Sequence, residues 1–570
     1  MRGLDQTGVA ADGQPRSIAP STTRLRFHRC RMAWSRADDR LLRGPADGRD
    51  HFWPAAYQNG VTPKRATVGP VRRTSKAARI LLITVITLAT VLGCGPESGP
   101  AQSATPSTRP ADLAATLRQR VSTDAMMAHL RSLQQIADAN DGNRATGTPG
   151  YQASVDYIAD ALRSHGFDVQ TPEFDLRLPF ADPPTVTIGD VNFAAKPLEY
   201  TIGTPPDGVT GPLVAARVED TPGCTAGDYD GLPVTGAVVV VDRGQCPFAS
   251  KQAVAAQRGA VALIVANNVD GELPGATLGE NTEVRIPVIS VSKADGARMR
   301  AHTGQATIKL NAGVRTQSTR NVIAQTRTGS TGDVVMVGAH LDSVPAGPGI
   351  NDDGSGVAAV LETALQLGSS PDAHNAVRFG FWGAEELGLL GSANYIQSLD
   401  VDALKDIALY LNFDMIASPN PGYFTYDGDQ STRLDPQQSP PRVPEGSAGI
   451  ERTLVGYLKQ AGKTAQDTSF DGRSDYESFT RAGIPVGGVF TGAVTDMTDQ
   501  QAQLWGGAAG QPFDPNYHQK TDTLDRIDQT ALDINGKAVA YSVGLYAQDL
   551  SGRNGVPVRD DRTRHVVAKS

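Results

Sequence analysis

Cysteine is scarce in this sequence, which holds four in 570 residues. Cys224 and Cys246 are the only ones that follow Cys94, and neither has a further cysteine at the spacing typical of metal ligands. A cysteine-bound metal or a cysteine nucleophile is therefore not expected. In a chain that is exported, two cysteines within one small domain predict a disulfide between Cys224 and Cys246.

Positive charge is also lacking over most of the chain. The full sequence has 53 Lys and Arg against 61 Asp and Glu. Residues 1–93 hold 16 basic and 6 acidic residues, so the remainder holds 37 and 55 and carries a formal charge of −18. Because nucleic-acid phosphates bind to basic surfaces, this acidic body excludes nucleic acid as an expected partner.

The apolar run at residues 80–92 falls short of the length that an ordinary membrane-spanning helix needs. It has 13 residues and follows four basic residues within positions 72–79, an order typical of a signal peptide. The run ends in the letters VLGC at residues 91–94, which resemble a bacterial lipobox and imply that Cys94 is acylated. A plain secretory signal and a short anchor are the alternatives.

We therefore expect residues 71–93 to be a lipoprotein signal peptide and a lipid on Cys94 to tether the chain to the membrane. The chain would then be an exported cell-envelope lipoprotein on the outer face of the cytoplasmic membrane, with its later release left open. Residues 1–70 are expected to be disordered or to come from a mis-annotated start codon. Residues 94–112 are rich in Ser, Thr, Pro and Gly, which predicts a flexible tether.

The rest of the chain is an α/β domain with a β-rich insertion. We expect the α/β domain to comprise residues 113–172 and 314–550, the insertion to comprise 173–313, and a disordered tail to follow at 551–570. Within the insertion, the stretch GAVVVVDRGQCPFASKQAVAAQRGAVALIVANN resembles a protease-associated domain. Such domains are inserted into many exopeptidases and carry no chemistry of their own.

A strand, a polar loop and a helix follow one another at residues 334–367. The apolar run at 334–337 predicts a buried strand, and apolar residues at helical spacing begin at Val357. Between them lie His340, Asp342 and the acidic pair Asp352-Asp353. Open α/β sheets present ligands at the carboxyl ends of their strands, so these groups are well placed to hold a metal.

Two further predicted strands end in acidic residues. Residues 377–381 precede Glu385 and Glu386, and residues 407–413 precede Asp414. Near the C-terminus, His518 follows a long loop. Two histidines and three carboxylates form a ligand set that suits zinc, with manganese or cobalt as possible substitutes.

With these segments in place, the chain resembles the di-zinc aminopeptidases of the leucyl-aminopeptidase type, within the zinc-exopeptidase family. The matching motifs are HLDS from His340, GINDDGSG from Gly349, AEE ending at Glu386, NFDM around Asp414, GRSDY from Gly472 and YH at Tyr517. The resemblance implies a central mixed, mostly parallel β-sheet flanked by helices, with the protease-associated domain as an insertion.

The resemblance also implies two zinc ions per chain. His340 and Asp414 would hold one zinc, and Glu386 and His518 would hold the other. Asp352 would bridge the two, with a cis peptide bond to the residue that follows it.

The remaining roles implied by the resemblance concern catalysis and substrate binding. Asp342 would hydrogen-bond the free nitrogen of the His340 imidazole. Glu385 would act as general base, and Tyr517 would stabilise the oxyanion. The substrate would contact Arg473, Met415 and Phe490. Some close relatives have cysteines flanking the Tyr-His pair, whereas Pro515 and Thr521 are the residues near it in this chain.

These roles predict a monomeric metallo-aminopeptidase that releases large apolar residues from peptides with a free N-terminus, using a zinc-bridged hydroxide. Three alternatives remain open on the same scaffold: a carboxypeptidase or dipeptidase, a glutaminyl-cyclase-like transferase with one zinc, and a non-catalytic receptor.

Overall fold

The computed structural model describes residues 110–568 except 218–221, 272, 274, 303, 433–441 and 552–554. The predicted extension, signal peptide and lipidation site at Cys94 lie outside the described residues, as does nearly all of the predicted tether. Among the helices that are described, none combines the length and apolarity needed to cross a membrane.

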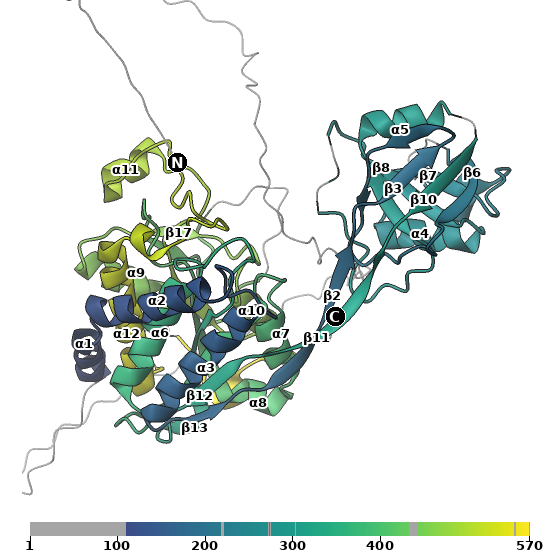
Figure 1. The fold of residues 1–570 in the computed structure, drawn as a ribbon. Coiled ribbons are helices and arrows are strands. Elements are labelled where there is room, and N and C mark those ends of the chain that lie inside the picture. Colours follow the sequence, from purple (N-terminus) through teal and green to yellow (C-terminus); the bar gives the residue numbers. More distant parts are fainter. Residues whose placement is uncertain are drawn as a thin grey trace, which may run out of the picture. The chain divides into compact units, whose positions relative to one another are not determined.

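The α/β domain is built on an eight-stranded sheet (Figure 1). Its strands, in spatial order, are β1 (Asp168–Gln170), β12 (Val322–Gln325), β14 (Asn375–Trp382), β13 (Ser330–His340), β15 (Ile407–Phe413), β18 (Val486–Phe490), β16 (Phe424–Tyr426) and β17 (Gln466–Thr468). Strands β14, β13, β15 and β18 run parallel to their neighbours in that order, whereas β12 and β16 pair antiparallel with β14 and β18. The expected mixed, mostly parallel sheet is confirmed.

Both faces of this sheet are covered by helices, as its continuous apolar strands require. Val335 and Val337 of β13 pack into a core with α2, α6 and α12, which contact one another on one face (Figure 1). Met336 points to the other face and packs with Leu404 of α8 and Phe479 of α10. The helices are α1 (Pro110–Arg120), α2 (Thr123–Asp138), α3 (Pro149–Ser164), α6 (Gly354–Leu367), α7 (Leu390–Gln397), α8 (Val401–Asp406), α9 (Ser447–Gln460), α10 (Tyr476–Arg481), α11 (Asp499–Trp505) and α12 (Gln529–Gln548).

The insertion begins and ends in a two-stranded antiparallel ribbon. Strand β2 (Glu173–Ala181) pairs with β11 (Ala312–Arg320) over nine residues, from Glu173 with Arg320 to Ala181 with Ala312. The predicted boundary at residue 313 therefore falls inside a strand, because β11 continues the pairing that β2 begins.

Between the ribbon strands lies a second eight-stranded sheet with its own cores. Its strands are β3 (Thr185–Ile188), β4 (Val191–Phe193), β5 (Lys196–Pro197), β6 (Val209–Ala215), β7 (Val238–Asp242), β8 (Ala262–Ala266), β9 (Val288–Val291) and β10 (Gln305–Lys309), with helices α4 (Phe248–Gln257) and α5 (Lys293–Arg300). Alternate residues of β7 pack into two different apolar clusters, one on each face. Cys224 and Cys246 are joined by a disulfide in this region.

The expectation of a disordered tail is wrong for residues 555–568. Arg562 donates to the carbonyl oxygens of Gly332 (2.9 Å) and Lys405 (2.7 Å), and Arg564 donates to those of Leu404 (3.2 Å) and Ile407 (2.9 Å). Two buried arginines hold this segment in place by hydrogen bonds, so its low apolar content did not indicate disorder.

Candidate active site

The site lies where three neighbouring parallel strands end. His340 is the last residue of β13, Asp414 directly follows β15, and Glu385 and Glu386 lie in the turn after β14. Because the carboxyl ends of parallel strands meet at one edge of a sheet, these side chains converge. The fold thereby brings together residues that lie as far apart in the sequence as His340 and Asp414, which are separated by 74 positions.

Asp352 lies between two imidazoles, just before α6. Its Oδ1 is 3.1 Å from Nε2 of His340, and its Oδ2 is 3.2 Å from Nε2 of His518. Oε2 of Glu386 is 3.0 Å from Nε2 of His518, and Oδ1 of Asp414 is 3.6 Å from Nε2 of His340. One carboxylate therefore joins two groups, each made of one imidazole and one further carboxylate.

These ligand atoms fit divalent metal ions. Buried atoms without a hydrogen-bond partner gather here: Asp352 Oδ2, Glu386 Oε1, Asp414 Oδ1 and His518 Nε2. A polar atom that is buried and unsatisfied is costly, so their convergence points to cations. Imidazole nitrogen and carboxylate oxygen are ligands that zinc accepts.

The pKa shifts show how strongly charge is concentrated. Burial lowers the pKa of His518, but the carboxylates of Asp352 and Glu386 outweigh burial and raise it to about 10. Burial and the charge of Asp352 raise the pKa of Glu386 to about 7, although His518 opposes them. Protons are thus held at positions that a divalent cation can take instead.

Asp353 connects the three segments that carry the ligands. Its Oδ1 accepts from the backbone N–H of Gly356 (2.9 Å), in the first turn of α6, and of Met415 (3.2 Å), beside Asp414. Its Oδ2 accepts from the backbone N–H of His340 (3.1 Å). The peptide bond between Asp352 and Asp353 is cis, as the family resemblance implied.

Asp342 reaches the imidazole of His340 in a different way from the one expected. The backbone carbonyl oxygen of Asp342 lies 3.1 Å from Nδ1 of His340, whereas its carboxylate Oδ1 lies 3.8 Å away. The carboxylate instead accepts from the backbone N–H of Glu385 (3.1 Å). Asp342 therefore orients both His340 and Glu385, the first through its main chain.

Glu385 lies beside the metal ligands and is almost fully buried, with 2% of its surface exposed. Its Oε2 is 3.9 Å from Nε2 of His340. Burial raises the pKa of Glu385 well above its usual range, and the negative charge of Glu386 adds to this effect although His340 opposes it. A carboxylate with a raised pKa is suited to accept and return a proton.

A cavity of about 190 Å³ opens onto Glu385 and the metal ligands. Met415 and Phe490 contribute apolar surface to it, and Arg473 and Tyr517 contribute polar groups. The side chains of Arg473 and Tyr517 are hydrogen-bonded to each other, and the ring of Tyr517 stacks on His518 with centroids 3.8 Å apart. All residues predicted to bind the substrate thus line the same cavity as the predicted ligands.

Arg144 supports the site, and its role could not be read from the sequence. Its buried guanidinium donates to the carbonyl oxygens of Leu341, Pro348 (2.9 Å) and Gly349 (2.6 Å). These carbonyls belong to the loop that joins His340 to Asp352. The sequence shows only that Arg144 lies in a turn-rich segment, directly after Gly142 and Asn143.

Two carboxylates from the loop that carries His518 also support the site. Asp522 accepts from the backbone N–H groups of Asn351 (2.8 Å) and Asp352 (3.0 Å). Asp514 accepts from the Asn351 side chain (2.7 Å). Neither residue lies in a motif, because the pairing joins segments more than 160 positions apart.

Asp414 is held by a chain of buried polar groups. Ser474 Oγ donates to Asp414 Oδ2 (2.6 Å), and the Asn412 amide donates to Ser474 Oγ (2.8 Å). The Tyr410 hydroxyl donates to Asn412 (3.0 Å) and accepts from the indole N–H of Trp382 (2.9 Å). The bond from Ser474 occupies Oδ2, so Oδ1 is the oxygen that faces His340.

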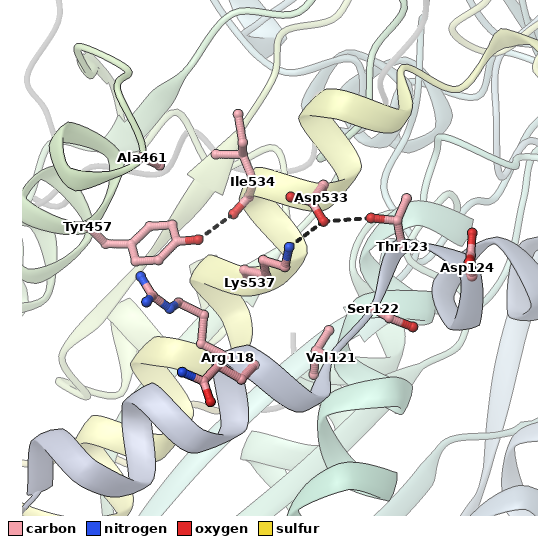
Figure 2. Close-up of a pocket in the computed structure, with 11 residues that line it drawn as sticks. Arg118, Val121, Ser122, Thr123, Asp124, Tyr457, Ala461, Asp533, Ile534 and Lys537 are labelled. Atoms are coloured by element: carbon pink, nitrogen blue, oxygen red, sulfur yellow. Dashed lines mark hydrogen bonds and ion pairs between the residues drawn. The ribbon is translucent and has the colours of Figure 1, made fainter.

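A larger cavity, of about 770 Å³, lies between α1, α2, α9 and α12, and it contains none of the predicted site residues (Figure 2). Lys537 Nζ is 2.6 Å from Asp533 Oδ1, which also accepts from the Thr123 hydroxyl (2.6 Å). The Tyr457 hydroxyl donates to the carbonyl oxygen of Ile534 (3.1 Å). We assign no chemistry to this cavity, because these polar groups form an ion pair and hydrogen bonds with one another.

Comparison with known proteins gives two family matches. The model of peptidase family M28 matches residues 321–543, and the model of the PA domain matches residues 209–299. The chain is 64% identical over 499 residues to the probable lipoprotein aminopeptidase LpqL of Mycobacterium tuberculosis, covering 88% of this chain and 100% of that protein. It is 42% identical over 429 residues to an aminopeptidase of Pseudomonas aeruginosa, covering 72% of this chain and 78% of that protein.

Solved structures match over most of the chain as well. The aminopeptidase from Aneurinibacillus sp. strain AM-1 superposes with a TM-score of 0.58 at 28% identity, covering 76% of this chain and 96% of that one. BSAP, a zinc aminopeptidase from Bacillus subtilis, has a TM-score of 0.52 at 24% identity, covering 76% of this chain and 98% of that one. The second likeness supports the fold alone.

Proposed function

The chain belongs to peptidase family M28 and is a zinc-dependent aminopeptidase, and we propose that it holds two zinc ions and releases large apolar residues from the N-terminus of peptides. The observation that supports this proposal is the position of Asp352, whose Oδ1 lies 3.1 Å from Nε2 of His340 and whose Oδ2 lies 3.2 Å from Nε2 of His518. Asp414 would complete the first site and Glu386 the second.

In the proposed reaction, each residue has one task. Bound zinc supplies Lewis acidity and lowers the pKa of a water molecule. Glu385 accepts the proton of the attacking water on its carboxylate and passes it to the nitrogen of the leaving amine, for which its raised pKa is suited. The hydroxyl of Tyr517, oriented by Arg473, donates to the carbonyl oxygen of the scissile bond as negative charge develops there.

Binding of the substrate follows from the lining of the 190 Å³ cavity. Carboxylates of Glu385 and Asp414 favour a free α-ammonium group, whereas a blocked N-terminus would lose that attraction. Met415 and Phe490 favour an apolar first side chain. Discrimination among large apolar residues would be weak, since one methylene is worth only about 1–3 kcal/mol.

We further propose that the chain is exported as a monomer and is anchored by a lipid on Cys94 to the outer face of the cytoplasmic membrane. The similarity to a protein described as a lipoprotein supports this anchoring. Replacing Cys94 with Ser should move the activity from the membrane fraction to the soluble fraction, and unchanged fractionation would argue against the anchor.

The test of the function is a panel of amino-acid arylamides, assayed before chelation, after chelation and after zinc is restored. Leucine and phenylalanine arylamides should be cleaved, and activity should return with two zinc ions per chain. A C-amidated peptide should be a substrate and an N-acetylated one should not. The reverse pattern would indicate a carboxypeptidase, and one zinc per chain without hydrolysis of the arylamides would favour a cyclase-like transferase.

A further inference from the structure

The disulfide of the insertion joins two cysteines whose surroundings differ. Cys246 belongs to the loop between β7 and α4, where it is itself half-buried and its neighbours Gln245 and Pro247 are exposed. The two residues that precede Cys224, at positions 222 and 223, are buried instead. A small molecule can therefore approach the sulfur of Cys246 from an exposed loop, and the two sulfur atoms are not equivalent.

A buried lysine contacts the sulfur of Cys224. Lys251 of α4 is completely buried, and its Nζ lies 3.5 Å from Sγ of Cys224. The ammonium also donates to the carbonyl oxygen of Pro222. Burial lowers the pKa of Lys251 to about 8, although the negative charges of Asp228 and Asp242 oppose this effect. The side chain is therefore mostly charged at neutral pH.

The disulfide does not give this ammonium the partner that its charge favours. A charge removed from water is costly unless an opposite charge in contact compensates it, and neither a carbonyl oxygen nor a disulfide sulfur carries a full negative charge. A thiolate on Cys224 would place that charge next to Lys251. Because a neighbouring lysine stabilises a thiolate, opening of the disulfide with Cys224 as the thiolate is favoured at this position.

Tyr229 adds a second donor that lacks an acceptor. The residue is 1% exposed, and its hydroxyl has no hydrogen-bond partner among the described residues. A Cβ built on Gly223 would lie 2.8 Å from this hydroxyl, so the hydroxyl lies against the residue directly before Cys224. Buried polar atoms are rarely left without a partner. The surroundings of Cys224 thus offer more donor capacity than a disulfide sulfur can satisfy.

The helix α4 acts on the other cysteine, but more weakly. Cys246 lies one residue before Pro247, the N-cap of α4, and the N-terminus of a helix favours negative charge. That effect corresponds to only about half an elementary charge and decreases within one turn. Lys251 carries a full charge in contact with Sγ of Cys224. Cys224 is therefore the better leaving group of the two.

We propose that Cys246 is a site of S-thiolation by a low-molecular-weight thiol, with Cys224 as the leaving group. The small thiol loses its proton to solvent, and its thiolate attacks Sγ of Cys246. The bond between the two cysteine sulfurs breaks, and its electron pair leaves on Sγ of Cys224. One disulfide replaces another, so no separate oxidant or reductant is consumed, and the Lys251 ammonium keeps its proton as the counter-ion of the new thiolate.

This site is separate from the proposed catalytic centre. Neither cysteine lines the substrate cavity, and Lys251 does not line it either. S-thiolation would release the loop before α4 from Cys224 and leave the predicted zinc ligands unchanged. The result of the test below is consequently independent of the aminopeptidase assignment.

The test is a short incubation of the full chain with excess reduced glutathione, followed by N-ethylmaleimide to cap free thiols. Trypsin then separates the two cysteines, because it cleaves after Arg243. Cys224 lies on the peptide of residues 218–243, and Cys246 lies on the peptide of residues 244–251. Mass spectrometry of the parent protein should find glutathione mainly on Cys246 and N-ethylmaleimide mainly on Cys224.

Lys251→Met removes the charge and keeps a long side chain in the buried position. It should slow opening of the disulfide by roughly three- to tenfold and abolish the preference for Cys246, since the leaving thiolate loses its counter-ion. Lys293→Met, at an exposed position of α5 in the same insertion, is the matched control and should react as the parent protein does. A melting curve of each variant shows that it is folded.

The parent protein alone reveals which sulfur is attacked, so that result stands even if Lys251→Met fails to fold. The proposal is overturned if the parent protein forms no mixed disulfide, or if glutathione is found mainly on Cys224. It is also overturned if folded Lys251→Met opens as fast as the parent protein and with the same preference.

Discussion

Replacing Arg144 with Lys tests whether three buried hydrogen bonds, rather than a buried positive charge, hold the loop between His340 and Asp352. The guanidinium reaches three separate carbonyl oxygens in this loop. A lysine ammonium keeps the charge but can reach only one of them well, so two charge-assisted bonds are lost. At about 1.5–3 kcal/mol each, the loss of stability should be about 3–6 kcal/mol.

The measurement is thermal unfolding of the zinc-loaded protein, followed by circular dichroism. A change of 1 kcal/mol shifts the midpoint by about 2 °C in a large domain, so we expect a decrease of roughly 6–12 °C. Zinc affinity, measured by competition with a chelator, should decrease as well, because the loop leads directly to Asp352. Arg163→Lys on the exposed surface of α3 is the control and should leave both quantities unchanged. If Arg144→Lys behaves like that control, the loop is held by other contacts.

The remaining predictions concern the chemistry of the site. Glu385→Gln should lower kcat by roughly 10²–10⁴ while the zinc content stays at that of the parent protein, because only the proton transfer is removed. Tyr517→Phe should lower kcat by about 10²–10³ with little change in KM, since its hydroxyl acts on charge that develops in the transition state. In the metal-free protein, the raised pKa values of His518 and Glu386 mean that the folded state binds more protons than the unfolded state, so stability should fall as pH rises from about 4.5 to about 10. Urea unfolding in the presence of a chelator measures this slope, and a stability that rises with pH would contradict it.

The sequence predicted the elements that carry the ligands because their signals are local. The strand expected at residues 407–413 coincides with β15, and the strand expected at residues 377–381 lies within β14. Apolar periodicity identifies such elements, and a polar residue directly after a buried strand marks the edge of the sheet. His340, Glu386 and Asp414 could be chosen on that basis. Asp352 and His518 lie in loops, and the family resemblance assigned them as ligands and supplied the pairing.

The sequence did not predict the residues that hold the ligands in place. Arg144 contacts carbonyl groups about 200 positions away, and backbone carbonyls have no signature in a sequence. Asp522 is an ordinary acidic residue until the fold brings two N–H groups to it. The carbonyl oxygen of Asp342, rather than its side chain, faces His340 for a similar reason, since local main-chain geometry decides it.

The loop that contributes His518 has no disulfide to stiffen it, but two of its carboxylates accept hydrogen bonds from the residues that precede α6. Asp522 and Asp514 accept hydrogen bonds from Asn351 and Asp352, so a displacement of this loop would move Asp352, the proposed bridging ligand, together with His518. Exchange of residues 514–522 for a loop of another length would thus disturb both proposed zinc sites at once. Attempts to redirect substrate preference are better confined to the cavity wall at residues 493–495, which supply lining without contributing any of these bonds.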